Sequence, residues 1–146
     1  MKKNKIHLHW PELQMSLQAY LLEEQWAELK EVFLKSLPMS SIQSHAVVAG
    51  RQMYFPVRLL LPQAAEAKFY WEPMDKQPIG RINLEHVFQY LAINYEQPTE
   101  PVPALPLAQV VAEDVDTLLR IGEKVWHNLL FEPGRFLRVH VQRGES

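Results

Sequence analysis

The first part of the chain alternates between apolar and polar positions and then changes to a helical spacing. Residues 6–10 alternate strictly, and the alternation resumes over residues 15–21 after a turn at Pro11. A period of two on both sides of a proline turn predicts an antiparallel hairpin. From Glu23 to Ser36 the apolar residues recur every three or four positions, which predicts an amphipathic helix that ends before Pro38.

Short strand-like segments bounded by proline and glycine fill the middle of the chain. The apolar and aromatic patterns predict strands at 40–50, 53–61, 68–72, 81–84 and 88–95. The first two are expected to be bent or to lie at an edge, and the second of them contains a proline, which cannot donate to a strand ladder. Several short strands at regular spacing favour a barrel or a sandwich over alternating strand and helix units.

The last third begins with a proline-rich crossing at Gln97–Pro106. A short strand at 107–111, a second amphipathic helix at 115–129 and a final alternating strand at 137–141 follow. Residues 97–130 therefore belong to a single domain spanning 1–146, because too little chain follows the crossing to build a second core. We expect a mainly β fold with two helices: a small closed β-barrel with the Glu23–Ser36 helix covering one end and the final strand paired with the first hairpin.

Composition and charge restrict the classes of function. The 146 residues are 47% hydrophobic and 22% charged, which suits one globular core, and the formal net charge of -2 favours neither nucleic acid nor an anionic membrane. Without cysteine, the chain has no disulfides, thiolate nucleophiles or common structural zinc sites. The N-terminus lacks the apolar run of a signal peptide, so a cytoplasmic location is expected.

Scattered motifs then indicate a family. Leu37-Pro38, His45 five residues before Gly50, and Ala92-Ile93-Asn94-Tyr95 before the proline-rich crossing resemble the small bacterial cyclophilin-like domains. The segment 107–126 is similar to the helical segment that follows this domain in cucumopine synthases. The resemblance implies a cyclophilin-like barrel and an enzyme of the Pictet–Spenglerase type, as found in alkaloid biosynthesis. Such an enzyme joins an amino acid with an aromatic or imidazole side chain to an α-keto acid, through an imine and without a redox cofactor.

One cluster of candidate residues lies on two predicted strands, or on one bent strand, after the first predicted helix. His45, Arg51 and Tyr54 lie within ten residues of one another and suit an anionic aromatic ligand. An arginine fork can hold a carboxylate, a histidine can transfer a proton near neutral pH, and a tyrosine can stack or hydrogen-bond. We therefore predict His45 as a catalytic group and Arg51 and Tyr54 as substrate-binding residues. The alternative interpretation packs His45 into the barrel and leaves Arg51 in a solvated loop.

A second cluster lies on strands predicted to line the barrel mouth. Glu72 is the second catalytic candidate, because it could accept the proton that leaves the ring carbon if burial raises its pKa. The further substrate-binding candidates are Tyr70, Tyr90, Asn94 and Tyr95. Aromatic residues at alternate strand positions more often belong to a core, so packing is the competing interpretation.

No metal or cofactor is expected. His7 and His9 share one face of the first strand, but two histidines without a third ligand are a weak metal signal. None of the glycine-rich phosphate loops or nucleophile motifs occurs in the sequence.

The expected partners are small-molecule substrates and a second copy of the chain. The apolar face of the second helix exceeds what a small barrel can bury and predicts a homodimer; its residues are Leu118, Leu119, Val125, Trp126 and Leu129. Two alternatives to the condensing enzyme remain open. One is a non-catalytic module that binds a small ligand or a protein. The other is a peptidyl-prolyl isomerase, which ranks last because no arginine stands in the Phe-His-Arg setting that these isomerases use.

Overall fold

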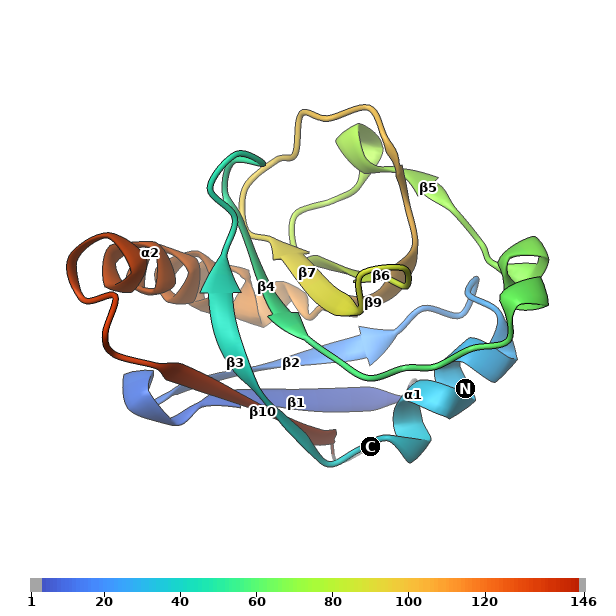
Figure 1. Cartoon of the computed structure of the whole chain (residues 1–146), viewed down its shortest axis with the longest axis horizontal. Helices are drawn as coiled ribbons and strands as arrows, with labels where there is room; N and C mark the ends of the chain where they lie inside the picture. The colour runs from blue at the N-terminus through green and yellow to red at the C-terminus, as the bar shows by residue number, and fades with distance from the viewer. Residues whose placement is uncertain (1–3, 145–146) are drawn as a thin grey trace.

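Eight antiparallel strands close into a barrel in the computed structural model, which describes residues 4–144 (Figure 1). The predicted mainly β fold with a small closed barrel is thereby confirmed. Around the barrel the order is β1 (Lys5–Trp10), β10 (Leu137–Arg143), β3 (Met39–His45), β4 (Gln52–Pro56), β7 (Tyr90–Asn94), β6 (Arg81–Glu85), β9 (Pro106–Val110) and β2 (Met15–Leu21).

The interior of the barrel is a packed core to which alternate strand residues contribute. In the predicted hairpin β1–β2, Ile6, Leu8 and Trp10 point inward and are buried, and the final strand β10 pairs with β1 as expected. The indole Nε1 of Trp10 donates to the side-chain oxygen of Gln43 at 2.9 Å. This bond supplies the partner that a buried indole N–H needs, so the core contains a tryptophan without an unsatisfied donor at its ring nitrogen.

The first helix, α1 (Ala27–Lys35), begins four residues later than the sequence predicts. The backbone N–H of Leu22 still donates to the carbonyl of Leu107 in β9 at 3.0 Å, and the N–H of Trp26 donates to the side chain of Gln25. These bonds hold the segment against the barrel in a non-helical conformation. The helix then inserts Leu29 and Phe33, both fully buried, into the barrel core.

The second helix, α2 (Val115–Phe131), lies on the opposite side of the barrel from α1 in Figure 1. Its apolar face is largely used within the chain, since Leu118 and Val125 are buried in the barrel core. The homodimer remains a prediction. It now depends on apolar side chains that stay exposed near the end of the helix: Leu129, Leu130, Phe131 and Phe136.

The middle of the chain differs from the sequence prediction. The strand expected at 68–72 is wrong: a 3-10 turn at Gln63–Lys68 leads to a two-residue strand, β5 (Glu72–Pro73), which pairs with β8 (Pro103–Ala104). The expectation that 40–50 or 53–61 forms an edge is also wrong, because β3 and β4 each pair on both sides in the closed barrel. Within residues 4–144 no helix has the length and apolar character to cross a bilayer.

The contact between α2 and the barrel depends on Gly122. A Cβ atom at this position would lie 2.4 Å from ring carbons of Tyr95, which is itself buried. We expect Gly122→Ala to lower the free energy of unfolding by about 1–3 kcal/mol, because helix and ring must separate. Urea unfolding measures the change. Gly134→Ala is the matched control: no atom lies within 4 Å of its Cβ position, and a change beyond about 0.5 kcal/mol there would contradict the explanation.

Candidate functional site

The outer face of β4, β7 and β6 carries a polar surface. Side chains alternate along these strands, so apolar residues such as Met53, Ile93 and Ile82 enter the core and their neighbours point outward. The outward set comprises Gln52, Tyr54, Arg81, Asn83, Glu85, Tyr90, Ala92 and Asn94. A mostly polar face of this kind needs either solvent or a polar covering segment.

Two segments that we call the strap, residues 70–78 and 97–105, cover this face. They are joined through the short β5–β8 ladder and arch over β6 and β7 (Figure 1). Glu72 in the strap and Arg81 in β6 form a two-pronged ion pair, with Nε to Oε1 at 2.8 Å and Nη2 to Oε2 at 2.6 Å. Their side chains are only 14% and 15% exposed, respectively. The strap is thus attached to the barrel wall by a charge pair largely shielded from water.

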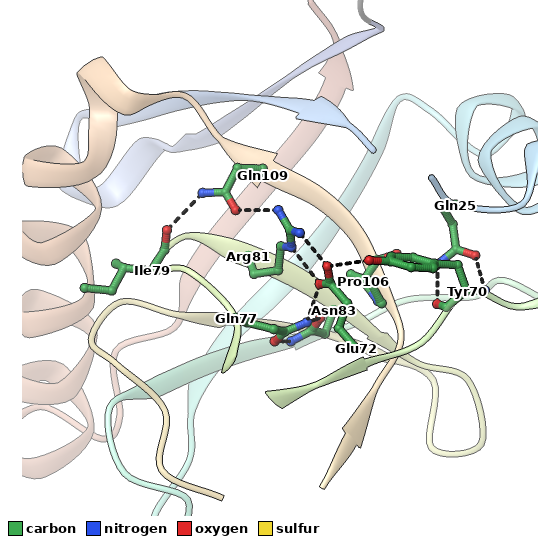
Figure 2. A network of polar contacts seen from close by, with 9 residues as sticks. All are labelled: Gln25, Tyr70, Glu72, Gln77, Ile79, Arg81, Asn83, Pro106 and Gln109. Carbon is green, nitrogen blue, oxygen red and sulfur yellow. Dashed lines mark hydrogen bonds and ion pairs between the residues drawn. The ribbon is translucent and has the colours of Figure 1, made fainter. Parts of the chain in front are cut away.

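Further groups converge on the same carboxylate (Figure 2). The Tyr70 hydroxyl donates to Oε2 at 2.9 Å, and Gln77 donates to Oε1 at 3.1 Å. The hydrogen bonds from Arg81 hold the pKa of Glu72 below its ordinary value, although burial acts in the opposite direction. Sequence reasoning made a role of Glu72 as proton acceptor conditional on a raised pKa, and the pKa is lowered instead. Glu72 is an ionised carboxylate with its lone pairs engaged.

The strap is also tied to the barrel by neutral hydrogen bonds. The buried Gln25 side chain receives the backbone N–H of Tyr70 at 3.0 Å and donates to the carbonyls of Tyr70 at 3.1 Å and Pro106 at 2.5 Å. Gln77 and Asn83 exchange two amide hydrogen bonds of 2.8 Å each. The side-chain amide of Gln25 binds both the N–H and the carbonyl of Tyr70, the two groups that a neighbouring strand would otherwise bind. Residues 68–71 therefore need no strand partner at Tyr70.

Between the strap and the outer face of the barrel lies a cavity of about 300 Å³, which we call the strap cavity. Its floor comes from β4, β6 and β7 and its roof from the strap. The lining residues are Ala49, Gln52, Trp71, Met74, Asn83, Leu84, Glu85, His86, Tyr90, Ala92, Glu100, Val102, Pro103, Ala104 and Leu105. The volume is at the lower end of the range for small-molecule sites, and aromatic, amide and carboxylate groups line it together.

Tyr90 is central to the aromatic part of the strap cavity. Its ring lies 5.1 Å from that of Tyr54, centroid to centroid. Burial raises the pKa of Tyr90, and the charges of Glu85 and Glu100 raise it further. The hydroxyl therefore stays protonated and can donate a hydrogen bond to a ligand. It also lies within the negative field of two lining carboxylates.

His45 and Tyr95 form a separate cluster beside α2. The Nδ1 of His45 lies 2.7 Å from the carbonyl of Ala46, and its Nε2 lies 2.6 Å from the Tyr95 hydroxyl. A carbonyl only accepts, so Nδ1 carries the proton and Nε2 accepts from Tyr95. Burial lowers the pKa of His45 and raises that of Tyr95. The Trp126 ring, 4.7 Å away, covers the imidazole, whose two nitrogens are both occupied within the protein.

Arg51 lies on the surface near this second cluster. It is half-exposed and pairs with Glu96 at 3.3 Å and with Glu123 at 3.9 Å. It does not line the strap cavity, although Ala49 in the same loop does. The structure therefore places Arg51, the predicted carboxylate clamp, beside two glutamates and outside the lining of the strap cavity.

The predicted site residues thus divide into three groups. Tyr90 lines the strap cavity, the Tyr54 ring lies against the Tyr90 ring, and Asn94 lies beside the lining residue Gln52, from which it accepts a hydrogen bond of 3.1 Å. Tyr70 and Glu72 belong to the strap network, whereas His45, Arg51 and Tyr95 lie toward α2. Sequence reasoning missed the lining residues Glu85, His86, Glu100, Asn83 and Gln52. The alternation of Arg81, Asn83 and Glu85 with Ile82 and Leu84 was the available signal.

Other parts of the surface are less suited to a ligand. A hollow of about 390 Å³ beside α2 is larger, but exposed charged side chains such as Arg120, Glu123 and Lys124 form most of its wall. His7 and His9 stack with ring centroids 6.4 Å apart. Across residues 4–144, three or more histidine, aspartate or glutamate side chains nowhere come together as a metal site.

Known structures provide an independent comparison. The chain is similar to McbB. Over 97% of this chain and 45% of the McbB chain, the structure of McbB in complex with tryptophan has a TM-score of 0.81 and 34% sequence identity. The chain therefore spans less than half the length of McbB, and the shared part includes the barrel, the strap and α2.

A more distant similarity concerns the fold alone. The solution structure of the hypothetical protein AF2241 from Archaeoglobus fulgidus matches 97% of this chain and 95% of its own, with a TM-score of 0.59 and 10% identity. No protein-family model matches the chain, and no curated protein matches it significantly. Of these two structures, McbB has the sequence identity that allows an argument beyond the fold.

The ion pair at the strap generates a prediction about stability. Glu72→Gln leaves Arg81 with an uncompensated, shielded charge and should lower the free energy of unfolding by about 3 kcal/mol at about pH 7. The pKa of Glu72 is lowered in the fold, so its contribution is present above the ordinary value of 4.5 and is lost as the pH falls through the folded pKa. Urea unfolding should show that the free energies of unfolding of Glu72→Gln and wild type differ less at about pH 3 than at about pH 7.

Glu31→Gln, an exposed change on α1, is the control and should shift stability by less than about 0.5 kcal/mol. A loss at Glu72→Gln that stays the same at both pH values would show that packing, not charge, accounts for it.

Proposed function

We propose that the strap cavity is the active site of a cofactor-independent condensing enzyme. It joins an amine bearing an aromatic or imidazole ring to a carbonyl compound by a Pictet–Spengler-type cyclisation; the sequence resemblance implies an amino acid and an α-keto acid as this pair. One observation carries the proposal. A cavity lined by aromatic rings and carboxylates lies on a barrel that is similar, at 34% identity, to McbB in complex with tryptophan.

The proposed reaction needs positioning and proton transfer from the protein. The amine nitrogen attacks the carbonyl carbon and water leaves, which gives an iminium ion. The electron-rich ring carbon then attacks the iminium carbon, and the ring carbon loses its proton as aromaticity returns. No electrons are exchanged with a cofactor. Holding two reactants in one orientation can supply several kcal/mol of the barrier reduction, and a placed base contributes a further factor.

Glu85 is the lining carboxylate best placed to accept the ring proton. It stands directly opposite Tyr90 across the β6–β7 ladder, and among residues 4–144 its carboxylate accepts a single bond, from the backbone N–H of Val87 to Oε1 at 3.2 Å. Glu72 is instead saturated by Arg81, Tyr70 and Gln77. Glu85 thus takes the role that sequence reasoning gave to Glu72, while Trp71 and Tyr90 offer faces for the substrate ring.

The sequence-based candidates His45 and Arg51 remain an alternative location for the chemistry. His45 is buried under Trp126 and lines a smaller hollow of about 160 Å³ that includes Asn128 and Phe136. For His45 to act, its bonds to Tyr95 or Ala46 must open. The two locations can be separated by substitution.

The test is product formation with matched variants. Incubation of the chain with tryptophan, tryptamine, histidine or histamine and 2-oxoglutarate, followed by mass spectrometry, should reveal a condensed product with the mass of the two reactants minus water. Glu85→Gln keeps the bond to Val87 but removes the base, so we expect turnover to fall by about a hundredfold or more. Glu31→Gln should retain wild-type turnover.

Circular dichroism and urea unfolding must show that the variants are folded. If His45→Asn abolishes turnover while Glu85→Gln does not, the reaction takes place beside α2. If the wild-type chain binds these amines but forms no product with any carbonyl partner, the chain is the non-catalytic binding module that the sequence also allowed.

A further inference from the structure

We propose that the strap cavity selects amines without a carboxylate: arylethylamines or imidazolylethylamines in preference to the corresponding amino acids. This inference rests on the proposed function and narrows its substrate class. It comes from the charges that surround the cavity and from the partners that those charges already have.

The ionisable groups that line the cavity favour a cation. The half-buried Glu85 and the exposed Glu100 are its acidic lining residues, and none of the lining residues is lysine or arginine. His86 is the only basic group among them, and its Nε2 already contacts Glu66 Oε1 at 2.5 Å. A protonated His86 is therefore balanced by Glu66, and the two lining glutamates leave the cavity with an excess of negative charge.

The nearby arginines are engaged elsewhere. Arg81 uses two nitrogens on Glu72 and a third on the side-chain oxygen of Gln109 at 3.1 Å. Arg51 is half-exposed outside the cavity and pairs with Glu96. A carboxylate bound in the cavity would need one of these pairs to break, because a buried charge requires a compensating partner.

An ammonium group has suitable partners in the same place. It would be attracted by Glu85 and Glu100 and could lie against the faces of Trp71 or Tyr90, which favour cations. Glu85 stands directly opposite Tyr90 across the β6–β7 ladder, which places one carboxylate beside the aromatic part of the cavity. A volume of about 300 Å³ accommodates one bicyclic aromatic amine and a small carbonyl partner.

The same repulsion applies to the carbonyl partner. Its carboxylate, if present, would remain at the solvent side of the strap, whereas an aldehyde could enter completely. The amine is the clearer test, because tryptamine and tryptophan differ only in the carboxylate.

Isothermal titration calorimetry with the wild-type chain measures the dissociation constants of tryptamine, tryptophan, histamine and histidine. We expect each amine to bind at least about tenfold more tightly than its amino acid, since the lining carboxylates of Glu85 and Glu100 repel the carboxylate of the amino acid. Glu85→Gln and Glu100→Gln should each move this ratio toward one, and Glu31→Gln should leave it unchanged. A structural defect weakens the binding of amine and amino acid alike and leaves the ratio of their dissociation constants unchanged. A change in this ratio therefore reports the loss of the carboxylate charge.

The outcomes distinguish the inference from the proposed function. Tryptophan binding as tightly as tryptamine, or more tightly, overturns the inference and leaves the condensing activity in place. If none of the four compounds binds, both the amine preference and the proposed condensing function are overturned. A tenfold preference for tryptamine that persists unchanged in both glutamate variants also overturns the inference, because the lining carboxylates would then not be its cause.

Discussion

The ion pair between Arg81 and Glu72 joins two parts of the chain that local structure does not connect. Arg81 belongs to the barrel wall and Glu72 to the strap, and the pair is 2.6 Å long at its shorter contact and mostly shielded from water. Charges in such a position need both a partner and hydrogen bonds for their remaining atoms. Tyr70, Gln77 and Gln109 provide these bonds, so the pair organises the surrounding amides and holds the strap above β6 and β7.

The cavity and its chemistry follow from this arrangement. Because the strap is held at the Arg81 end, Trp71, Met74 and residues 102–105 roof a space whose floor is the polar outer face of the barrel. The ion pair also engages Arg81 with Glu72, so the acidic groups Glu85 and Glu100 line the cavity without a lysine or arginine among the other lining residues. One interaction thus holds the strap over the barrel and keeps Arg81 out of the lining of the cavity.

On the side of the barrel near α2, packing and hydrogen bonds link the helix to the barrel. Gly122 lets the helix approach the Tyr95 ring, and Tyr95 in turn donates to His45 beneath Trp126. The residues that looked chemically reactive in the sequence are here mutually satisfied. His45 and Tyr95 therefore have contacts that fit packing, the alternative that the sequence left open for both residues.

The sequence by itself determined the elements whose signal is local. Alternation over residues 6–10, 15–21 and 137–141 and the helical spacing over 115–129 follow from which side chains must be buried, and the structure keeps all of them. Tertiary structure decided three other features: the non-helical segment before α1, the position of the strap, and the strap cavity. Gln25 binds the backbone of Tyr70, 45 positions away, and Arg81 binds Glu72 across two elements. Such contacts depend on which surfaces meet once the barrel closes, and no periodic pattern along the sequence predicts them.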